Sequence, residues 1–587
     1  MEEVEGERGS ATLQTCRQVV HPLLVSLAGF CLTAYLGWTG KIEPWVHACT
    51  VGSGILFAAE RLWVFRCLRV RWRERRRLSW HAVLAVLVLL MTAALILAPM
   101  DPYALLNPAG YIFILLSVLV SGLASMIHHQ TRFTARAFHP GAVLIGSFFF
   151  IIISGALLLK MPLSTVPGQS CTWLDALFTS TSAVCVTGLT VQNTATFFSG
   201  TGQTIILILI QVGGLGIMTL TFFAAVVLFE GLSLHDRLLL GKMIQENRLA
   251  RIGRTLAFIM GMTVVCETVG ALVLYQGLQE ISDTGERWFQ SVFHSVSAFC
   301  NAGFSTFPDG LAGTEIKGNL TWQGCIMGLV VVGGLGSLVN EDVSIWAVNR
   351  VRRIFRPAMP VARLRVHTRL VLTVTAFLVV AGAGIISLTE FVFWEGPQNS
   401  GGFMTALFHS ITARTAGFNT VPMGQIGPLT VQVLMVLMLI GGSPGGTAGG
   451  LRTTVVCVGL GYLWNQLRGG RRGMVVFRRT IPRETGARAL GLMVLAGLWL
   501  GVNFILLQLM ETGSGVAETT LLFELVNAFA TVGLSLDLTP VLSAGGKTIL
   551  IINMFIGRIG LLTVMATLIP PDRRPVSGRP AEDVLLT

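Results

Sequence analysis

The chain has 587 residues, of which 52% are hydrophobic and only 12% are charged. Globular domains carry about 25% charged residues, and the mean hydropathy of +0.70 is too high for a soluble protein of this length. These values exclude a soluble enzyme, a nucleic-acid-binding protein and a disordered scaffold. The ten cysteines form no CxxC motif and no Cys/His cluster, which indicates neither a zinc site nor a disulfide framework.

Twelve apolar segments approach the roughly 20 residues that a transmembrane helix needs. Four of them lie in an N-terminal region, residues 1–140, at about 22–40, 47–65, 81–99 and 109–127, and the acidic N-terminus shows no signal-peptide pattern. The other eight lie at about 142–160, 202–229, 255–277, 320–347, 369–393, 428–463, 489–509 and 547–569. The sequence therefore predicts an all-α polytopic membrane protein.

Basic residues concentrate in alternate loops between these segments. If the N-terminus is cytoplasmic, 33 of the 42 Lys and Arg residues fall on the inside of the membrane. The inside loops are then 66–80, 128–139, 231–254, 350–369 and 465–488, and 571–587 is a cytoplasmic tail. This bias is what the positive-inside rule expects. It predicts a multi-pass protein of the cell membrane with a cytoplasmic N-terminus, and it explains the net charge of +12 without nucleic acid.

Four short segments resemble one another at nearly even spacing. Each runs from a Phe to a Gly nine or ten residues later: Phe178 to Gly188, Phe293 to Gly303, Phe408 to Gly417, and Phe523 to Gly533. The closing glycines are 115, 114 and 116 residues apart. Such a segment is too short to cross a bilayer as a helix, and irregular backbone at membrane depth occurs only inside protein or along a watery cavity. We therefore predict four re-entrant loops, each a pore helix followed by an extended strand.

An apolar segment lies on either side of each loop, which predicts four pseudo-symmetric membrane–pore–membrane units. Their predicted bounds are 141–232, 251–349, 366–465 and 486–570. Four such loops around an axis describe a selectivity filter, in which backbone carbonyls replace the hydration shell of a cation. Glycine suits this role because the backbone needs unusual φ and ψ angles. Close helix contact through small residues is the alternative, but it does not explain the even spacing. The candidate cation-binding residues are Val186, Thr187, Gly188, Asn301, Ala302, Gly303, Thr415, Ala416, Gly417, Thr531, Val532 and Gly533.

The second apolar segment of each unit also repeats. Gly213-Gly214 matches Gly333-Gly334 and Gly441-Gly442, whereas the fourth unit has Gly557-Arg558. If the units surround an axis, three glycines leave space and Arg558 projects into it. An arginine near mid-membrane is a functional hypothesis by default. Close helix contact explains the paired glycines equally well.

The third unit is interrupted by a run rich in Gly and Pro, which does not form a stable helix. We predict an unwound loop below the filter that acts as a gate, and a mere helix kink is the alternative. The candidate gate residues are Gly441, Gly442, Ser443, Pro444, Gly445, Gly446, Thr447, Ala448, Gly449 and Gly450, together with Arg558.

The four pore segments, this loop and Gly557-Arg558 together resemble the Trk/Ktr/HKT superfamily of potassium transporters, in its bacterial Trk/Ktr branch, over about residues 140–570. The resemblance implies that each unit is similar to one potassium-channel subunit, that Gly441–Gly450 is an intramembrane gate and that Arg558 is a positive barrier. Glycine rather than serine at position 188 implies potassium as the transported ion. The resemblance also implies a homodimer, a cytosolic nucleotide-binding regulatory ring docked on the inside loops, and no cofactor on this chain.

Several other polar residues near the pore segments have alternative roles. Asp175 and Glu524 are expected near the starts of pore helices, where a carboxylate interacts favourably with the helix dipole or concentrates cations at the outer mouth of the pore. Structural roles are expected for the remainder: hydrogen bonds for His294 and His409, bracing of the loop for Arg414, pairing with a neighbouring unit for Glu267, and filling of small apolar space for Cys185 and Cys300.

The predicted function is potassium uptake through the four-loop filter, past the Gly-rich loop and Arg558. Sodium-coupled potassium symport, or a sodium-permeable transporter on the same scaffold, is the nearest alternative. A membrane enzyme would need a catalytic cluster, and the sequence has no HExxH and no GxxxxGK[ST] motif. A membrane scaffold gives no reason for four similar loops.

Overall fold

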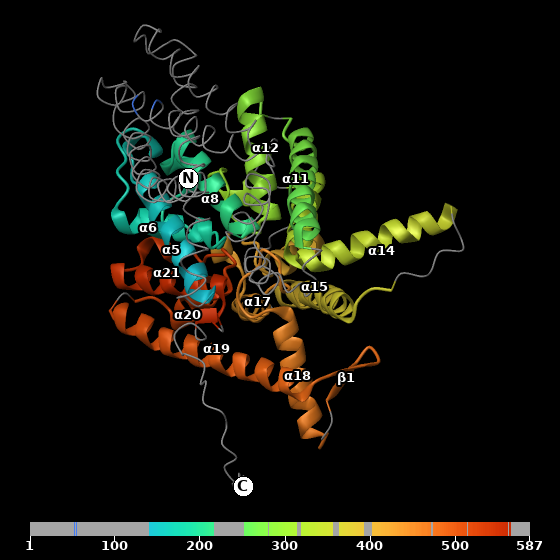
Figure 1. Cartoon of the computed structure of the whole chain (residues 1–587). Helices are drawn as coiled ribbons and strands as arrows, with labels where there is room; N and C mark the ends of the chain where they lie inside the picture. The colour runs from blue at the N-terminus through green and yellow to red at the C-terminus, as the bar shows by residue number, and fades with distance from the viewer. Residues whose placement is uncertain are drawn as a thin grey trace, which may run out of the picture.

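The computed structural model describes residues 140–216, 252–279, 281–313, 318–355, 363–392, 402–470, 473–513, 515–561 and 563–564, together with Gly52 and Ile55. The first four predicted spans lie outside the described residues, apart from those two positions, and so does the tail 571–587. The described part is mostly helical, as predicted (Figure 1).

Each predicted unit contains a helix of 11 to 16 residues that follows a longer one. Unit one consists of α5 (Pro140–Leu159), η3 (Pro162–Ser164), α6 (Trp173–Val184), α7 (Thr194–Phe197) and α8 (Gly200–Leu215). Unit two consists of α11 (Ile252–Gly277), α12 (Thr284–Phe299), η5 (Gly310–Ala312) and α13 (Leu320–Leu335), followed by α14 (Ser337–Phe355).

The other two units follow the same order. Unit three consists of α15 (Val366–Val392), α16 (Gly402–Thr412), η6 (Met423–Gln425), α17 (Pro428–Leu439) and α18 (Thr453–Leu467). Unit four consists of α19 (Arg483–Met510), α20 (Glu518–Ala530), η7 (Thr539–Val541) and α21 (Ala544–Ile559). We refer to the short helices α6, α12, α16 and α20 as the pore helices.

Local signals explain where several of these helices begin. The Asp175 N–H donates to the Thr172 hydroxyl over 3.1 Å at the start of α6, and the Gly285 N–H donates to Asp283 Oδ1 over 3.0 Å at the start of α12. Such N-caps satisfy backbone donors that a helix cannot pair internally. Proline at the first position of α17 fits because its missing N–H would be unpaired there anyway.

A recurring three-residue contact joins the helices in units one to three. A glycine on the first helix lies directly against a pore-helix serine and a leucine of the second helix: Gly155 with Ser180 and Leu209, Gly270 with Ser295 and Leu329, and Gly382 with Ser410 and Leu437. Each serine hydroxyl donates to a carbonyl of the first helix, over 2.6, 2.7 and 2.9 Å respectively. The absence of a glycine side chain is therefore what allows each pore helix to approach.

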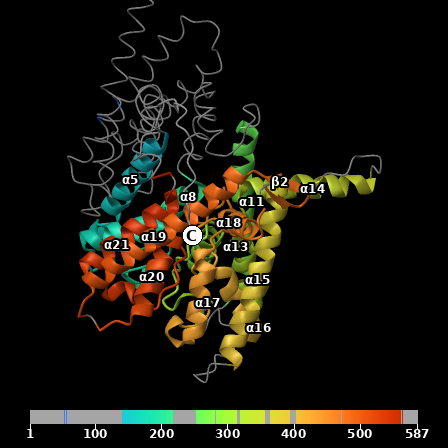
Figure 2. The same cartoon turned by 90° about the horizontal axis from the view of Figure 1, so that it is seen from below.

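The predicted span at 320–347 does not form one straight helix. It bends by 105° where α13 gives way to α14, because Gly336 between them has φ of +83°, a left-handed conformation that glycine adopts readily. Figures 1 and 2 show α14 projecting sideways from the helical body.

The predicted span at 428–463 is also interrupted, as its Gly-rich run indicated. The chain is unwound between α17 and α18, with an isolated parallel bridge between Ile440 and Leu451 at the base of the loop. Beyond α18, β1 (Met474–Val476) and β2 (Arg479–Ile481) form an antiparallel hairpin in which Val475 pairs with Thr480. Its two turn residues, Phe477 and Arg478, both have positive φ, as a two-residue hairpin turn requires.

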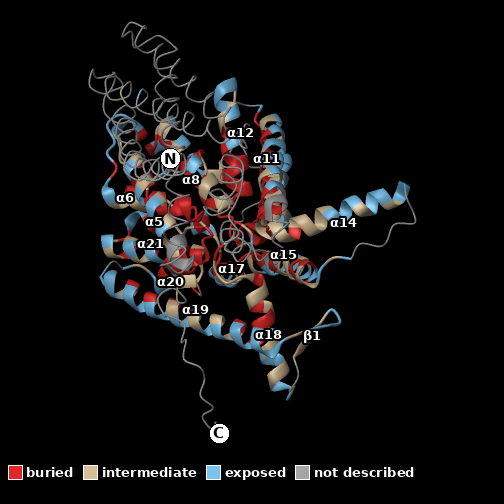
Figure 3. Ribbon diagram, in the orientation of Figure 1, coloured by how far each residue is buried: buried red, intermediate tan, exposed pale blue. Residues whose placement is uncertain are grey.

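Three described helices, Thr255–Gly277, Val366–Glu390 and Arg483–Met510, are long and apolar enough to cross a membrane, and the bent pair α13–α14 would be a fourth if it counts as one span. These long helices present apolar side chains outward, including Val265 on α11, Val380 on α15 and Leu498 on α19. Figure 3 shows the exposed residues of α19 along the edge of the body and the buried residues toward its centre. An apolar exterior of this kind fits a lipid environment.

The units contact one another in a closed cycle. The second helix of each unit packs against the pore helix of the next: α8 against α12, α13 against α16, α17 against α20, and α21 against α6. The last contact returns to the first unit, so the four pore helices surround a common centre.

Candidate ion pathway

The four closing glycines, which we call the glycine ring, lie against one another at this centre. Each is so close to the next unit's loop that an added Cβ would collide with a carbonyl oxygen: that of Ala302 for Gly188, Ala416 for Gly303, Val532 for Gly417, and Thr187 for Gly533. The contacts therefore run through all four units and close on themselves. Segments that are more than 100 residues apart in sequence are brought together here, with no room for side chains at the glycines.

The backbone has the same unusual conformation in all four loops. The residue two positions before each glycine has a positive φ: 57° at Val186, 59° at Asn301, 76° at Thr415 and 51° at Thr531. The glycines have φ of 89°, 69°, 76° and 101° in chain order. A non-glycine residue in this region costs about 1–3 kcal/mol and persists only where its surroundings fix it. Because the same conformation recurs at four equivalent positions, the surrounding fold imposes it on the loops.

The loop N–H groups face the pore helices. The residue before each glycine donates its N–H to a pore-helix carbonyl: Thr187 to Ser182 over 2.8 Å, Ala302 to Ser297 over 2.7 Å, Ala416 to Thr412 over 2.9 Å, and Val532 to Asn527 over 3.2 Å. Within the described residues, none of the carbonyl oxygens of the twelve candidate residues accepts a hydrogen bond. Buried carbonyls are normally paired, so this set of oxygens is available to a ligand.

Side-chain oxygens in the loops are also unpaired. The buried hydroxyls of Thr187, Thr415 and Thr531 have no hydrogen-bond partner among the described residues. In addition, all four pore helices end immediately before the loops, so that their carboxyl ends converge on the glycine ring. Each helix end carries a partial negative charge of about half a unit. Unpaired oxygens and four negative helix ends form a site suited to a cation.

The second-segment glycines divide into two kinds. An added Cβ on Gly213, Gly333 or Gly557 would collide with a backbone carbonyl at the end of the pore helix of its own unit. Close contact therefore explains the first position of each pair. At the second position, Gly214 lies against Cys300 and Gly334 lies against the Asn301 side chain, next to the filter loop of unit two.

Arg558 occupies the corresponding second position in unit four and is half-buried. Its guanidinium donates to the carbonyl oxygens of Thr447, in the Gly-rich loop, and Gly213, in unit one. The side chain therefore joins three units at one point.

The Gly441–Gly450 loop extends across the units. Ser443 N–H donates to Gly334 O over 3.1 Å, and its hydroxyl donates to Leu335 O, both in unit two. On the other side, Gly450 N–H donates to Gly557 O over 3.3 Å, and Gly449 lies against Thr531, two residues before the closing glycine of unit four. The loop thus contacts the fourth glycine-ring loop, the second helices of units two and four, and Arg558.

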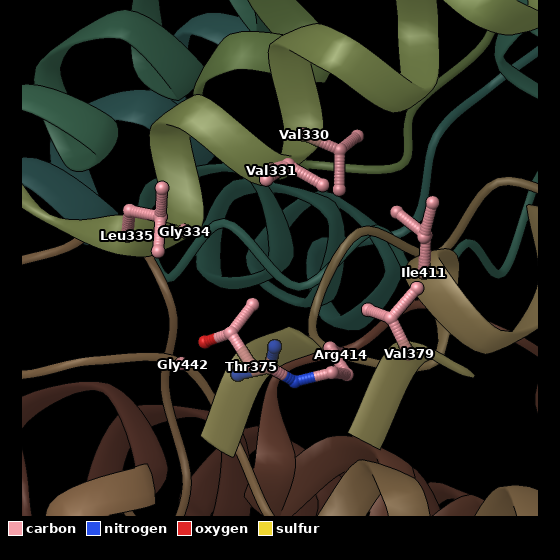
Figure 4. A pocket seen from close by; sticks show the side chains of 9 residues that line it. All are labelled: Val330, Val331, Gly334, Leu335, Thr375, Val379, Ile411, Arg414 and Gly442. Carbon is pink, nitrogen blue, oxygen red and sulfur yellow. The ribbon is translucent and has the colours of Figure 1, made fainter. Parts of the chain in front are cut away.

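Arg414 contacts the Gly-rich loop. Its guanidinium donates to Gly441 O over 3.4 Å. Its side chain lines a small pocket together with Val330, Val331, Gly334, Leu335, Thr375, Val379, Ile411 and Gly442. Figure 4 shows it among side chains of α13, α15 and α16. It links the third filter loop to the Gly-rich loop, which fits the predicted bracing role.

Other polar residues near the pore have protein partners. Glu267 accepts from Gln211 Nε2 over 3.1 Å, so it pairs with a neighbouring unit as expected. His294 contacts Gln290 O over 2.8 Å and Ser305 Oγ over 2.9 Å, while Cys185 and Cys300 are buried in the core. Among the described residues, no three His, Cys, Asp or Glu side chains are placed to hold a metal ion.

The two carboxylates expected near pore-helix starts differ in position. Asp175 lies in the first turn of α6 and pairs with Lys547 of unit four over 3.2 Å. Glu524 does not lie at a helix start: α20 begins at Glu518, which places Glu524 in its middle, fully buried. The helix extends further toward its N-terminus than the apolar pattern indicated.

Sequence reasoning missed the pore-helix residues that hold the loops. Ser182 and Asn527 each use a side-chain oxygen as well as a backbone one, accepting from Gly188 N over 3.1 Å and from Gly533 N over 2.7 Å. The signal was present in the repeat, because Ser182, Ser297 and Asn527 all lie six residues before a closing glycine.

Comparison with known proteins is consistent with this geometry. A potassium/sodium uptake protein of Enterococcus hirae is 33% identical over 461 residues, covering 76% of this chain and 97% of that protein. A Ktr system potassium uptake protein B of Vibrio alginolyticus is 35% identical over 464 residues, covering 78% and 96%. The counterpart of that protein in Bacillus subtilis is 35% identical over 433 residues, covering 73% and 92%.

The fold is similar to the crystal structure of the potassium transporter TrkH from Vibrio parahaemolyticus. The TM-score is 0.60 at 18% identity, and the match covers 84% of this chain and 97% of that one. The family model TrkH, described as a cation transport protein, matches residues 106–573. The chain therefore belongs to the TrkH family of cation transport proteins, as the membrane subunit of a Trk/Ktr-type transporter.

Proposed function

We propose that this protein carries potassium into the cell through the glycine ring. One observation carries the proposal: four loops with the same left-handed backbone surround one centre, their N–H groups bond to the pore helices, and their carbonyl oxygens have no partner within the described part of the chain. A dehydrated cation needs a set of oxygens of this kind. In this proposal the filter is formed by Val186, Thr187 and Gly188 of unit one and by the three corresponding residues of each other unit. The four units are pseudo-symmetric repeats.

The choice of potassium rests on two supports. Two of the relatives are named as potassium uptake proteins, and glycine occupies all four closing positions. The membrane potential supplies the driving force, about 2.3 kcal/mol per unit charge for each 100 mV.

The Gly441–Gly450 loop and Arg558 would form the gate. The loop contacts the filter strand at Thr531, and the half-buried Arg558 carries a positive charge on a guanidinium that donates to unit one and to the loop. A passing cation must meet this charge, so the loop and the guanidinium have to shift together for conduction.

The assembly is part of the same proposal. The inside loops carry most of the basic residues, which supports a cytoplasmic N-terminus in the cell membrane. Two relatives are named as protein B of a Ktr system, and a system implies more than one kind of chain. We propose a homodimer that docks a cytosolic nucleotide-binding ring.

Sodium transport on the same scaffold is the second candidate, either as symport with potassium or as sodium permeation. The Enterococcus hirae relative, named as a potassium/sodium uptake protein, favours it. The two functions differ in whether potassium flux needs sodium.

Growth rescue tests the proposal directly. The full chain is expressed in a bacterium that lacks its potassium-uptake systems and is grown at low potassium, with and without sodium. Rescue in both media is expected. Rescue only with sodium would indicate the symporter instead, and no rescue by a protein present in the membrane would contradict both.

A further inference from the structure

One position of the pore helices differs among the four units in a way that the filter alone does not explain. In each pore helix a fully buried Phe is followed by a buried polar residue, eight or nine positions before the closing glycine. These polar residues are Thr179, His294, His409 and Glu524.

In units two to four this residue contacts the strand that leaves the filter loop. His294 Nε2 lies 2.9 Å from Ser305 Oγ, and His409 Nε2 lies 3.4 Å from Thr420 Oγ1. In unit one, the Thr179 hydroxyl has no partner among the described residues. The pore helix is therefore tied to the departing strand in three units, by different chemistry.

Glu524 makes the most extensive of these contacts. Its Oε1 accepts from Ser535 Oγ over 2.5 Å and from Leu536 N over 3.1 Å, and its Oε2 accepts from Thr539 Oγ1 over 3.0 Å. All three partners are donors, and a carboxylate is an acceptor with two oxygens. Ser535 lies only two residues beyond Gly533, so these bonds fix the backbone next to the ring.

The described part of the chain places no cation against this carboxylate. Among the described residues, no Lys, Arg or His forms an ion pair with Glu524. A fully buried, unpaired carboxylate is costly and needs hydrogen bonds to hold it, which indicates a role beyond general stability.

We propose that Glu524 is a specificity-determining positioning residue that holds the fourth loop open at the spacing of the larger cation. This inference rests on the proposed function. A filter prefers potassium only if its carbonyl oxygens stay too far apart to coordinate sodium. In this proposal the bonds between Glu524 and the strand from Ser535 to Thr539 keep the fourth loop at that distance. Asn527 holds the fourth loop at Gly533 itself, whereas the three bonds of Glu524 reach the strand beyond it, from Ser535 to Thr539.

Two variants weaken the contact between Glu524 and the departing strand, one at the carboxylate and one at the strand. Glu524→Gln keeps the side-chain volume but loses one acceptor oxygen, and Ser535→Ala removes a donor from the strand itself. Glu511→Gln is the matched control: it changes a buried carboxylate that accepts from Ser543 N over 2.9 Å, away from the departing strand.

The measurement is the flux of rubidium, as a potassium analogue, and of sodium into vesicles containing each purified full-length protein. We expect the rubidium-to-sodium flux ratio to fall about tenfold in both variants, with maximal rubidium flux retained and the control unchanged. Glu524→Asp, with a shorter carboxylate, should recover part of the ratio. An unchanged ratio in Glu524→Gln and Ser535→Ala, or an equal fall in the control, would overturn the proposal.

The wild-type protein separates this inference from the proposed function. If it carries sodium in preference to rubidium, the proposed function fails, and the role of Glu524 fails with it; if it prefers rubidium and the variants keep that ratio, only the role of Glu524 is overturned. If it carries neither ion, both proposals are overturned.

Discussion

At the scale of single residues, the glycine ring depends on backbone geometry that other residues do not reproduce. Gly188 has φ of 89° and lies against the carbonyl of Ala302. Any side chain there meets both a strained backbone and a collision. The same two constraints hold at the other three closing glycines, which explains why the residue type recurs while its neighbours vary.

We predict that Gly188→Ser weakens selectivity for potassium over sodium on the order of tenfold, because the first loop has to move to relieve the collision. Reversal potentials, or paired ion fluxes in vesicles, measure this change. Gly146→Ser is the matched control, since Gly146 is exposed on α5 with open space around its Cα. Unaltered selectivity in Gly188→Ser would place the first loop outside the filter.

Arg558 allows its charge to be separated from its hydrogen bonds. We predict that Arg558→Ala raises cation leak on the order of tenfold by removing a positive charge from the pathway. Arg558→Lys retains the charge but cannot reach both Thr447 and Gly213 with a planar fork.

Leak through vesicles containing each variant distinguishes the two roles. If Arg558→Lys leaks no more than the wild type, the positive charge itself is the barrier. If Arg558→Lys leaks as much as Arg558→Ala, the hydrogen bonds to Thr447 and Gly213 keep the gate closed. Flux that is unchanged or lower in Arg558→Ala would contradict the barrier.

The sequence predicted the closing glycines because their nearly even spacing can be read directly from the chain. It did not reveal what surrounds them. Arg414 was assigned to bracing from its sign alone, but its partner Gly441 comes from a different part of unit three, 27 residues away. Glu524 was predicted near a helix start because the repeated segment begins at Phe523, whereas α20 begins at Glu518.

At the scale of elements, breaks in helices position the pathway. The apolar segments predicted the long helices Thr255–Gly277, Val366–Glu390 and Arg483–Met510 to within a few residues, but not the 105° bend at Gly336. Apolar residues lie on both sides of Gly336, so that residues 320–347 were predicted as one span. The break after α17 was predictable, since a run of Gly and Pro has no helical alternative. Composition thus predicts a break only where several unfavourable residues occur together.

The Gly-rich loop is held by few side-chain bonds, and Ser443 supplies one of them by donating to Leu335 O. We predict that Ser443→Ala raises cation leak about threefold to tenfold, because one hydrogen bond contributes about 0.5–1.5 kcal/mol.

Ser154→Ala is the control for this prediction, since its hydroxyl bonds only within α5, over 2.8 Å to Phe150 O. The comparison uses the same vesicle assay at matched protein content. Equal leak in the two variants would show that the loop is not restrained through Ser443.

At the scale of the whole molecule, the four units form a cycle that has to close between the first and the last. The contact of α21 with α6 makes this closure, and the Asp175–Lys547 ion pair reinforces it over 3.2 Å with both side chains mostly buried. Residues 372 positions apart therefore hold the cycle together, a pairing that no local pattern predicts.

Removing one partner of this pair leaves a buried charge unpaired. We predict that Lys547→Ala destabilises the purified protein by about 3 kcal/mol, seen as a lower melting temperature in detergent. Lys547→Met together with Asp175→Asn should recover part of the loss.

Arg488→Ala is the comparison variant, because the Arg488–Glu484 pair is largely exposed and contributes less than about 1 kcal/mol. Equal melting temperatures for Lys547→Ala and Arg488→Ala would show that the closing ion pair does not stabilise the cycle.

The central claim is that one cation binds among four loops of a single chain. X-ray diffraction from crystals of the purified protein grown in rubidium tests it most directly, because the anomalous signal locates the ion without reference to any function. The account predicts a rubidium peak enclosed by Gly188, Gly303, Gly417 and Gly533. Well-ordered loops with no peak among them, or with rubidium bound only elsewhere in the chain, would contradict it.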